Sequence, residues 1–243
     1  MAKRAARPNK NMKKIIQSVI AVVAVCLLAG CETTGLSPRE SSGASYANYI
    51  LSLQSGGTNA PVQKPVTPIR LAVAQAGESA PPETMLDQLA GQHTLVALVV
   101  ALPLPGELEN YNYNNRANNP NELYAARVKS VCNLARAAGA NYVFLFGGTV
   151  DSWRKNNPLS VFDITLVGGA ILPGGEINVE GTGAGALIET ATGEPVLFAS
   201  VDAKKTAGSP DYLAAGKTNE MRAQVRDELI AKLTGELLKK LAE

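Results

Sequence analysis

The chain has 243 residues, of which 46% are hydrophobic, 18% are charged and 5% are aromatic, and its 23 Lys and Arg nearly balance 21 Asp and Glu. This apolar fraction excludes a disordered chain, and three cysteines exclude a disulfide-rich scaffold. A single His and three Cys provide few ligands for a zinc site, so we expect neither a metal nor a cofactor.

The N-terminal segment has an uneven charge. Six basic residues precede the first apolar run, and no acidic residue occurs before Glu32. That run, Ile15–Leu28, is shorter than the roughly 20 apolar residues that a membrane-spanning helix needs. A basic segment, a short apolar run and small residues after it are typical of a secretory signal peptide. We therefore predict a signal peptide over residues 1–30, with a retained membrane anchor as the alternative.

The end of this segment, Leu28, Ala29, Gly30 and Cys31, resembles the lipobox of bacterial lipoproteins at all four positions. The resemblance implies that a signal peptidase recognises Leu28, Ala29 and Gly30, and that the Cys31 thiol and freed amine carry palmitate-type acyl chains. Two or three such chains hold a protein stably on a membrane. An ordinary secretory cleavage site beside a chance cysteine is the alternative.

Removal of the leader reverses the net charge. Because six of the 23 basic residues lie in residues 1–30, the mature chain has 17 basic and 21 acidic residues, or about −4. No basic excess remains for a nucleic-acid partner. Glu32 occupies the position where an Asp resembles an inner-membrane retention signal, so we expect a cell-envelope protein on the outer membrane, facing the periplasm.

Residues 31–66 are rich in Ser, Gly, Thr and Pro, which predicts a flexible tether. Within it, Tyr46–Leu53 is expected to form a short helix that rests on the domain or on the membrane. A folded domain is predicted over residues 67–243.

The first half of the domain alternates strands and helices. The run Leu95–Leu102 is continuously apolar, which predicts a strand buried on both faces. The other predicted elements are a strand at Ile69–Gln75, a helix between Pro82 and Gly91, a helix at Glu122–Ala138 and a strand at Asn141–Phe146.

The second half predicts antiparallel strands followed by one long helix, Thr218–Leu241. Gly181–Gly185 lacks the spacing of a dinucleotide-binding loop and is expected to be a turn or bulge. The expected strands are Val161–Val167, Glu176–Val179, Gly185–Glu189 and Val196–Asp202. The predicted fold class is α/β: a single mixed β-sheet packed by about three helices, with an antiparallel C-terminal half.

The sequence contains few candidates for catalysis. His93 is the only imidazole, and Cys132 lies on an apolar helix stripe, where we expect a buried, inert thiol. Paired carboxylates for a hydrolase remain an alternative, although their spacing fixes no shared face; the candidates are Asp151, Asp163, Asp202 and Asp211. We therefore predict that the protein is not an enzyme.

A binding loop is the more interesting candidate. Tyr111, Tyr113 and Asn114 lie in an Asn-rich segment at 110–121, and Tyr and Asn side chains suit adaptable contacts. Trp153 follows the next apolar strand and is a further candidate. An ordinary solvated loop is the alternative.

Three segments, Arg70–Ala74, Ala137–Tyr142 and Thr190–Leu197, are similar to a domain of bacterial envelope lipoproteins. The segments resemble the domain that is shared by the curli-secretion lipoprotein, the lipoprotein activators of penicillin-binding proteins and the N-terminal part of the Tol–Pal translocation protein. The segment from Asn157 to Ala170 resembles rhombotarget-type lipoproteins most. The resemblance implies a non-enzymatic interaction domain that binds an envelope protein or itself. A cell-wall or glycan hydrolase and a homo-oligomeric export component are the alternatives.

Overall fold

The computed structural model describes residues 47–50, 64–103, 120–156, 175–209 and 213–243. Residues Ser37–Glu243 form one compact unit, and its three buried apolar clusters draw only on residues from Ala47 to Leu241. This unit therefore contains its own core. The strand expected at Val161–Val167 lies outside the described residues.

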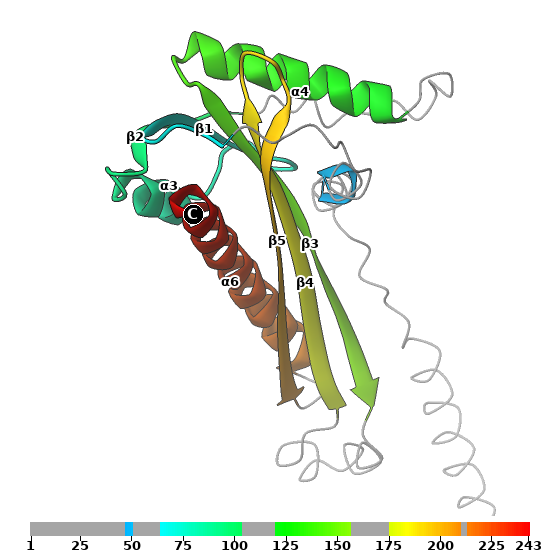
Figure 1. The fold of residues 1–243 in the computed structure, drawn as a ribbon. Coiled ribbons are helices and arrows are strands. Elements are labelled where there is room, and N and C mark those ends of the chain that lie inside the picture. Colours follow the sequence, from blue (N-terminus) through cyan, green and yellow to red (C-terminus); the bar gives the residue numbers. More distant parts are fainter. Residues whose placement is uncertain (1–46, 51–63, 104–119, 157–174, 210–212) are drawn as a thin grey trace, which may run out of the picture. The chain divides into compact units, whose positions relative to one another are not determined.

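The unit is built on one five-stranded sheet with the order β2-β1-β3-β4-β5 (Figure 1). β1 pairs in parallel with both β2 and β3, whereas β3, β4 and β5 are antiparallel. The predicted mixed sheet with an antiparallel C-terminal half is thus confirmed. The strands are β1 (Ile69–Gln75), β2 (Val96–Ala101), β3 (Tyr142–Asn156), β4 (Gly175–Glu189) and β5 (Pro195–Ser209).

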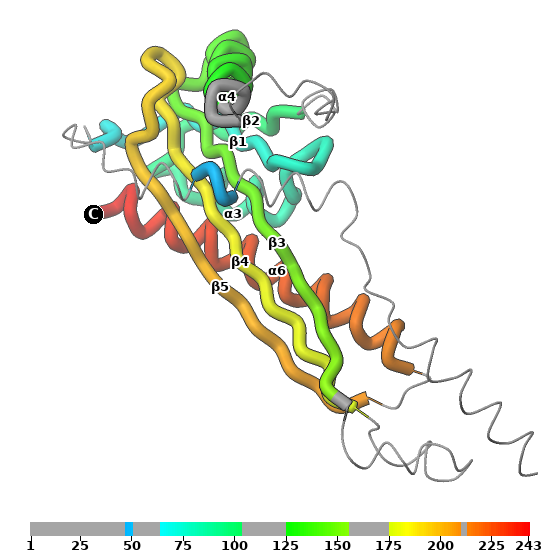
Figure 2. The backbone as a smooth tube through the Cα atoms, turned by 90° about the vertical axis from the view of Figure 1, so that its right-hand side faces the viewer, coloured from blue at the N-terminus to red at the C-terminus, as the bar shows by residue number. Residues whose placement is uncertain are grey.

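Helices cover both faces of the sheet. α3 (Glu83–Ala90) and α6 (Ala214–Ala242) pack on one face, where Phe144 and Leu187 are buried against them. α4 (Pro120–Ala137) packs on the other face, and Figures 1 and 2 show α6 running along the long strands. Packing by these three helices agrees with the prediction of about three, and the ends of α3 and α6 lie within a few residues of the predicted ends.

The α4 side of the core includes a segment from the expected tether. Residues 47–50 form one helical turn, and Ala47 and Ile50 are buried among side chains of α4 and the sheet. The short helix expected in this region therefore rests on the domain. The whole compact unit, rather than residues 67–243 alone, is the suitable unit for experiments.

The glycines of β4 do not form the predicted turn. β4 continues through Gly181, Gly183 and Gly185 as one strand, and these residues all face α3 and α6. A Cβ atom at Gly181 would lie 2.7 Å from Cδ1 of Leu229, and one at Gly183 would lie 2.9 Å from Cδ1 of Leu233. Gly181 and Gly183 are therefore explained by the close approach of α6, and Gly185 by the ring of Phe144 that packs against it.

The apolar strand β2 also differs from its prediction. It lies at the edge of the sheet, and Leu98 is 36% exposed, so it is not buried on both faces. Its neighbours Val99 and Val100 are half-buried. The apolar composition of β2 is typical of a central strand, but the order of strands places β2 at the edge of the sheet.

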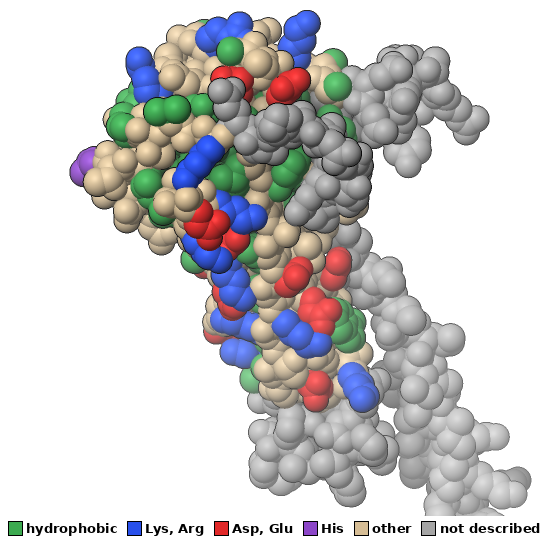
Figure 3. All heavy atoms as spheres, in the orientation of Figure 1, with side chains coloured by type: hydrophobic (Ala, Val, Ile, Leu, Met, Phe, Trp, Pro, Cys, Tyr) green, Lys and Arg blue, Asp and Glu red, His purple; other side chains and the backbone are tan. Residues whose placement is uncertain are grey.

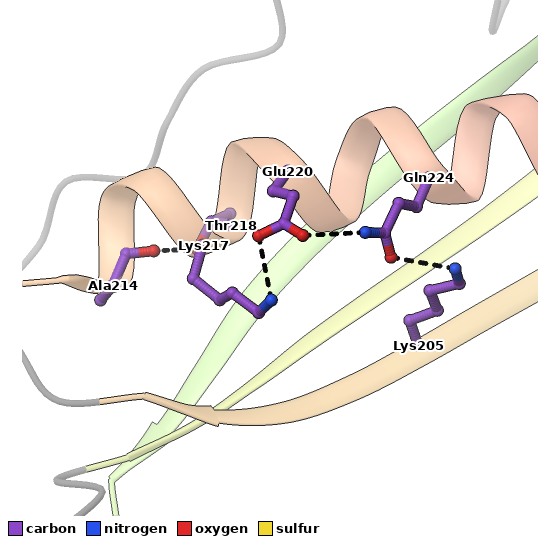
Figure 4. Close-up of polar contacts among 6 residues, drawn as sticks. All are labelled: Lys205, Ala214, Lys217, Thr218, Glu220 and Gln224. Atoms are coloured by element: carbon purple, nitrogen blue, oxygen red, sulfur yellow. Dashed lines mark hydrogen bonds and ion pairs between the residues drawn. The ribbon is translucent and has the colours of Figure 1, made fainter.

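Polar contacts join α6 to β5 (Figure 4). Lys205 of β5 donates a 3.0 Å hydrogen bond to Gln224, whose amide nitrogen donates a 3.0 Å bond to Glu220. Lys217 pairs with the same carboxylate at 2.9 Å. These exposed contacts supplement the apolar packing of Val225 and Leu229 beneath them.

Candidate interaction surface

The last three strands extend well beyond the other two. β3, β4 and β5 each have 15 residues, whereas β1 has seven and β2 has six. On one face of this extension, Met221, Val225 and Leu229 of α6 pack against Val179 and other sheet residues. Within the described parts of the chain, no helix or strand covers the opposite face.

We call this uncovered face the open face. Side chains alternate between the two faces of a strand, so a regular ladder brings polar residues of β3, β4 and β5 into rows. One row joins Trp153, Asn178 and Thr206. The open face consists of Asp151, Trp153, Lys155, Glu176, Asn178, Glu180, Thr182, Asp202, Lys204 and Thr206.

Trp153 is the main apolar feature of the open face. Its side chain remains 45% exposed, although indole rings are usually well buried in proteins. The Lys204 ammonium lies 5.8 Å from the ring centroid and also pairs with the Glu180 carboxylate. At an exposed site such a cation–π contact contributes about 0.5–1 kcal/mol. The ring is thus oriented by a neighbour while much of its surface stays accessible.

Beside Trp153, a hydrogen-bonded chain organises the polar groups. Asn178 is only 8% exposed, so its amide requires partners. The Thr206 hydroxyl donates a 2.9 Å hydrogen bond to Oδ1 of Asn178, and the Asn178 Nδ2 group donates to Oε1 of Glu176 at 3.3 Å. These bonds favour a fixed arrangement, because changing it would leave a buried amide without partners.

The open face is acidic. Its four carboxylates outnumber its two ammonium groups. Asp151 of β3 lies directly opposite Glu180 on the neighbouring strand β4. Figure 3 shows acidic and basic side chains interspersed over the lower part of the molecule in that view. Like charges placed opposite one another are unfavourable, and the contact of Lys204 with Glu180 offsets part of that repulsion.

The face offers stacking, hydrogen bonds and charge. Asp151 and Asp202 share it, but they lie on β3 and β5, which are separated by β4. Two strand spacings correspond to about 10 Å, which exceeds the separation of a retaining carboxylate pair. The arrangement is suited to binding an extended surface.

The structure places few of the predicted site residues. Trp153 lies within β3 and not in a loop, because this strand continues past the predicted end. His93 is exposed after α3, and Cys132 is buried on α4, where burial raises the pKa of its thiol and Arg136 partly opposes the shift. The residues outside the described part of the chain are Leu28, Ala29, Gly30, Cys31, Tyr111, Tyr113, Asn114, Asp163 and Asp211.

Sequence reasoning did not identify Asn178, Lys204 or Thr206 as surface residues. A signal for Asn178 exists in β4, where Glu176, Asn178 and Glu180 alternate with apolar residues. Such alternation predicts a strand with one polar face. It was missed because the strand was divided at its glycines.

Among the described residues, no three His, Cys, Asp or Glu side chains are grouped so that they could hold a metal ion. None of the helices in the described ranges combines the length and apolar character needed to cross a membrane.

Comparisons with known proteins give weak likenesses. No protein-family model and no curated protein matches the chain. A minor lipoprotein from Acinetobacter baumannii is 13% identical, with 73% of this chain and 92% of that chain covered and a TM-score of 0.32. Lipoprotein GNA1162 from Neisseria meningitidis is 12% identical, covering 66% and 99%, with a TM-score of 0.29.

A third solved structure, the PelC dodecamer from Paraburkholderia phytofirmans, is 19% identical, covers 70% of this chain and 90% of that chain, and has a TM-score of 0.28. Two of these three proteins are described as lipoproteins. At these identities and TM-scores, the likenesses assign neither a family nor a function to the chain. The resemblance to the curli-secretion and Tol–Pal group stays a prediction.

Proposed function

We propose that the protein is a lipid-anchored cell-envelope protein that uses the open face to bind another envelope protein. The observation that carries the proposal is Trp153, a half-exposed aromatic ring among ordered polar groups on a face that no described element covers. Aromatic side chains of this kind are enriched among the residues that dominate binding energy.

The anchor follows from the N-terminal sequence. Cys31 in a lipobox-like context would attach the chain to the membrane, and the first described residue of the domain, Ala47, follows 16 residues later. A Ser- and Gly-rich segment of that length has a root-mean-square reach of roughly 20–24 Å. This reach would hold the domain near the membrane that anchors it, within range of other envelope proteins.

The chemistry of the open face indicates the kind of partner. Its excess of carboxylates suits a surface that carries Lys or Arg, and Trp153 suits an apolar or cationic group against its ring. Because much of this attraction would be electrostatic at an exposed surface, binding should weaken as the salt concentration rises.

A test of the anchor is the mass of the mature N-terminus. Mass spectrometry is expected to find acyl chains on Cys31, and Cys31→Ser should move the protein out of the membrane fraction. An unmodified N-terminus at another residue would contradict the anchor and leave the open-face proposal standing.

The open face is tested by comparing two exposed apolar residues. Trp153 is 45% exposed and Leu134 on α4 is 42% exposed. The partner captured with the tagged protein from cross-linked membranes should fall by about tenfold or more for Trp153→Ala, as for a central interface residue. Leu134→Ala should leave the yield unchanged, and equal losses from both variants would contradict the proposal.

The proposed function is non-enzymatic. The rival is a hydrolase of cell-wall or glycan material, for which Asp151 on the open face is a described candidate. The purified unit Ser37–Glu243 is expected to leave peptidoglycan and glycan substrates intact. Turnover that Asp151→Asn abolishes would establish the hydrolase instead.

Self-association is a second candidate, which the edge strand β2 favours. Its six residues carry no charge, although exposed edges usually carry charges that prevent pairing. A second copy that pairs with this edge would satisfy its outward backbone groups. Size-exclusion chromatography with light scattering would then show an oligomer that Leu98→Lys disperses and Leu134→Lys does not.

A further inference from the structure

A cavity of about 570 Å³ lies under α4, on the same face of the sheet as the open face but nearer the other end of the long strands. Three elements form its walls: α4, the helical turn at residues 47–50 and the hairpin that joins β4 to β5. The volume falls within the range of roughly 300–1,000 Å³ that is typical of small-molecule sites. It is therefore large enough for an organic ligand.

The inner part of the cavity is apolar. Ile50, Val128 and Ile188 line it, and each is less than 10% exposed. Leu145 and Ala186 of the sheet complete the lining. Apolar surface of this extent favours a hydrocarbon group over water.

The hairpin that forms one wall is held in place. Thr190 is buried, and its hydroxyl donates 3.0 Å hydrogen bonds toward the carbonyl oxygens of Ala140 and Asn141. Arg136 of α4 donates to the carbonyl oxygens of Thr190 and Ala191, the latter at 3.4 Å. These contacts fix the wall without requiring a ligand.

The charged groups of the cavity are mainly basic. Among the described lining residues, Lys129 and Arg136 are basic and Glu194 is the one acid. Lys129 is exposed on α4, one turn from Cys132 and Asn133, which also line the cavity. An anionic group would thus find a complementary charge beside an apolar interior.

We infer that this cavity binds a small amphipathic anion, namely a single hydrocarbon chain that ends in a carboxylate. The hydrocarbon occupies the interior between Ile50 and Ile188, and the carboxylate lies near Lys129. This inference goes beyond the proposed function and does not depend on it, because the cavity and the open face share no residue.

The primary test is binding of the fluorescent fatty acid dansylaminoundecanoic acid to the unit Ser37–Glu243. Ala125 and Ala126 are adjacent, exposed residues of α4, but only Ala125 lines the cavity. Ala125→Trp should obstruct the cavity and weaken binding by about tenfold or more. Ala126→Trp should bind as the parent does, and far-UV circular dichroism would verify that both variants are folded.

The charge preference is tested with ligands of equal chain length. Dodecanoate should displace the probe better than dodecanol, and dodecyltrimethylammonium should be the weakest competitor. Lys129→Glu should weaken the binding of dodecanoate by about two- to fivefold, the range of an exposed ion pair. Lys239→Glu on α6 changes the net charge equally and should have no effect.

Cys132 provides an independent readout, because it lines the cavity and is the one cysteine in Ser37–Glu243. Dodecanoate should slow its reaction with a thiol reagent at concentrations that displace the probe. The inference fails if the probe does not bind, if both tryptophan variants bind alike, or if dodecanoate leaves the thiol reaction unchanged. Equal competition by all three ligands would contradict the anionic preference.

Discussion

Gly185→Ala tests the explanation given for the glycines of β4. A Cβ atom at this position would lie 2.4 Å from Cζ and 2.7 Å from Cε2 of Phe144, and 3.0 Å from Cβ of Phe146. Phe144 is fully buried, so its ring would have to move by about 1 Å within a close-packed interior. Such overpacking typically costs about 1–3 kcal/mol.

The lower chain entropy of Ala in the unfolded state offsets about 0.4–1 kcal/mol of that cost. With the middle of each range, about 2 kcal/mol for overpacking and about 0.7 kcal/mol for chain entropy, the expected net loss of unfolding free energy is about 1.3 kcal/mol. Gly235 on α6 is the control, because a Cβ atom there meets nothing within 4 Å. Gly235→Ala should stabilise the protein by about 0.5–1 kcal/mol through helix propensity.

Urea unfolding of the unit Ser37–Glu243, followed by circular dichroism and by the fluorescence of the single Trp, measures both changes. At a slope of about 2–3 kcal/mol/M, Gly185→Ala lowers the midpoint by roughly 0.5 M. A Gly185→Ala protein as stable as the parent would refute the idea that close packing requires glycine at this position.

Three further predictions concern single side chains. Thr190→Val removes a buried hydroxyl that serves two carbonyl oxygens and should cost about 1–3 kcal/mol in urea unfolding, whereas the exposed Thr192→Val should stay within about 0.5 kcal/mol. Gln224→Ala breaks the exposed contacts between α6 and β5 and should cost under about 1 kcal/mol, since exposed polar pairs contribute little. Burial raises the pKa of the Cys132 thiol above its ordinary value of 9.0. The stabilisation that this neutral thiol contributes to the folded state is therefore complete below pH 9.0 and is lost as the pH rises through the folded-state pKa. Unfolding measured from pH 8 to 10 should therefore show a smaller loss of stability for Cys132→Ser than for the parent.

Local patterns predicted most elements of the fold. The apolar stripe of α6 and the helix signals that flank α3 depend on residues close in sequence, and both helices lie where they were expected. The strand β1 and the mixed sheet followed from the same kind of pattern.

Errors arose where a residue type reflects a distant contact. Gly181 and Gly183 resembled a turn, but they accommodate Leu229 and Leu233, which follow 48 and 50 residues later. The exposure of β2 depends on the order of strands, which its own composition does not encode. The open face required the register that brings Trp153 beside Asn178, and this register was hidden once β4 had been divided.

The most direct test of the interaction proposal is site-specific photocrosslinking in living cells. A photoreactive amino acid is placed at Trp153 on the open face or at Lys239, an exposed position on α6. Further placements at Tyr111 and Asn114 test the predicted binding loop in the same experiment. The account predicts that Trp153 captures one specific envelope protein, at a yield that falls with salt in permeabilised cells. Crosslinks at Trp153 that are no more frequent or specific than those at Lys239 would contradict it.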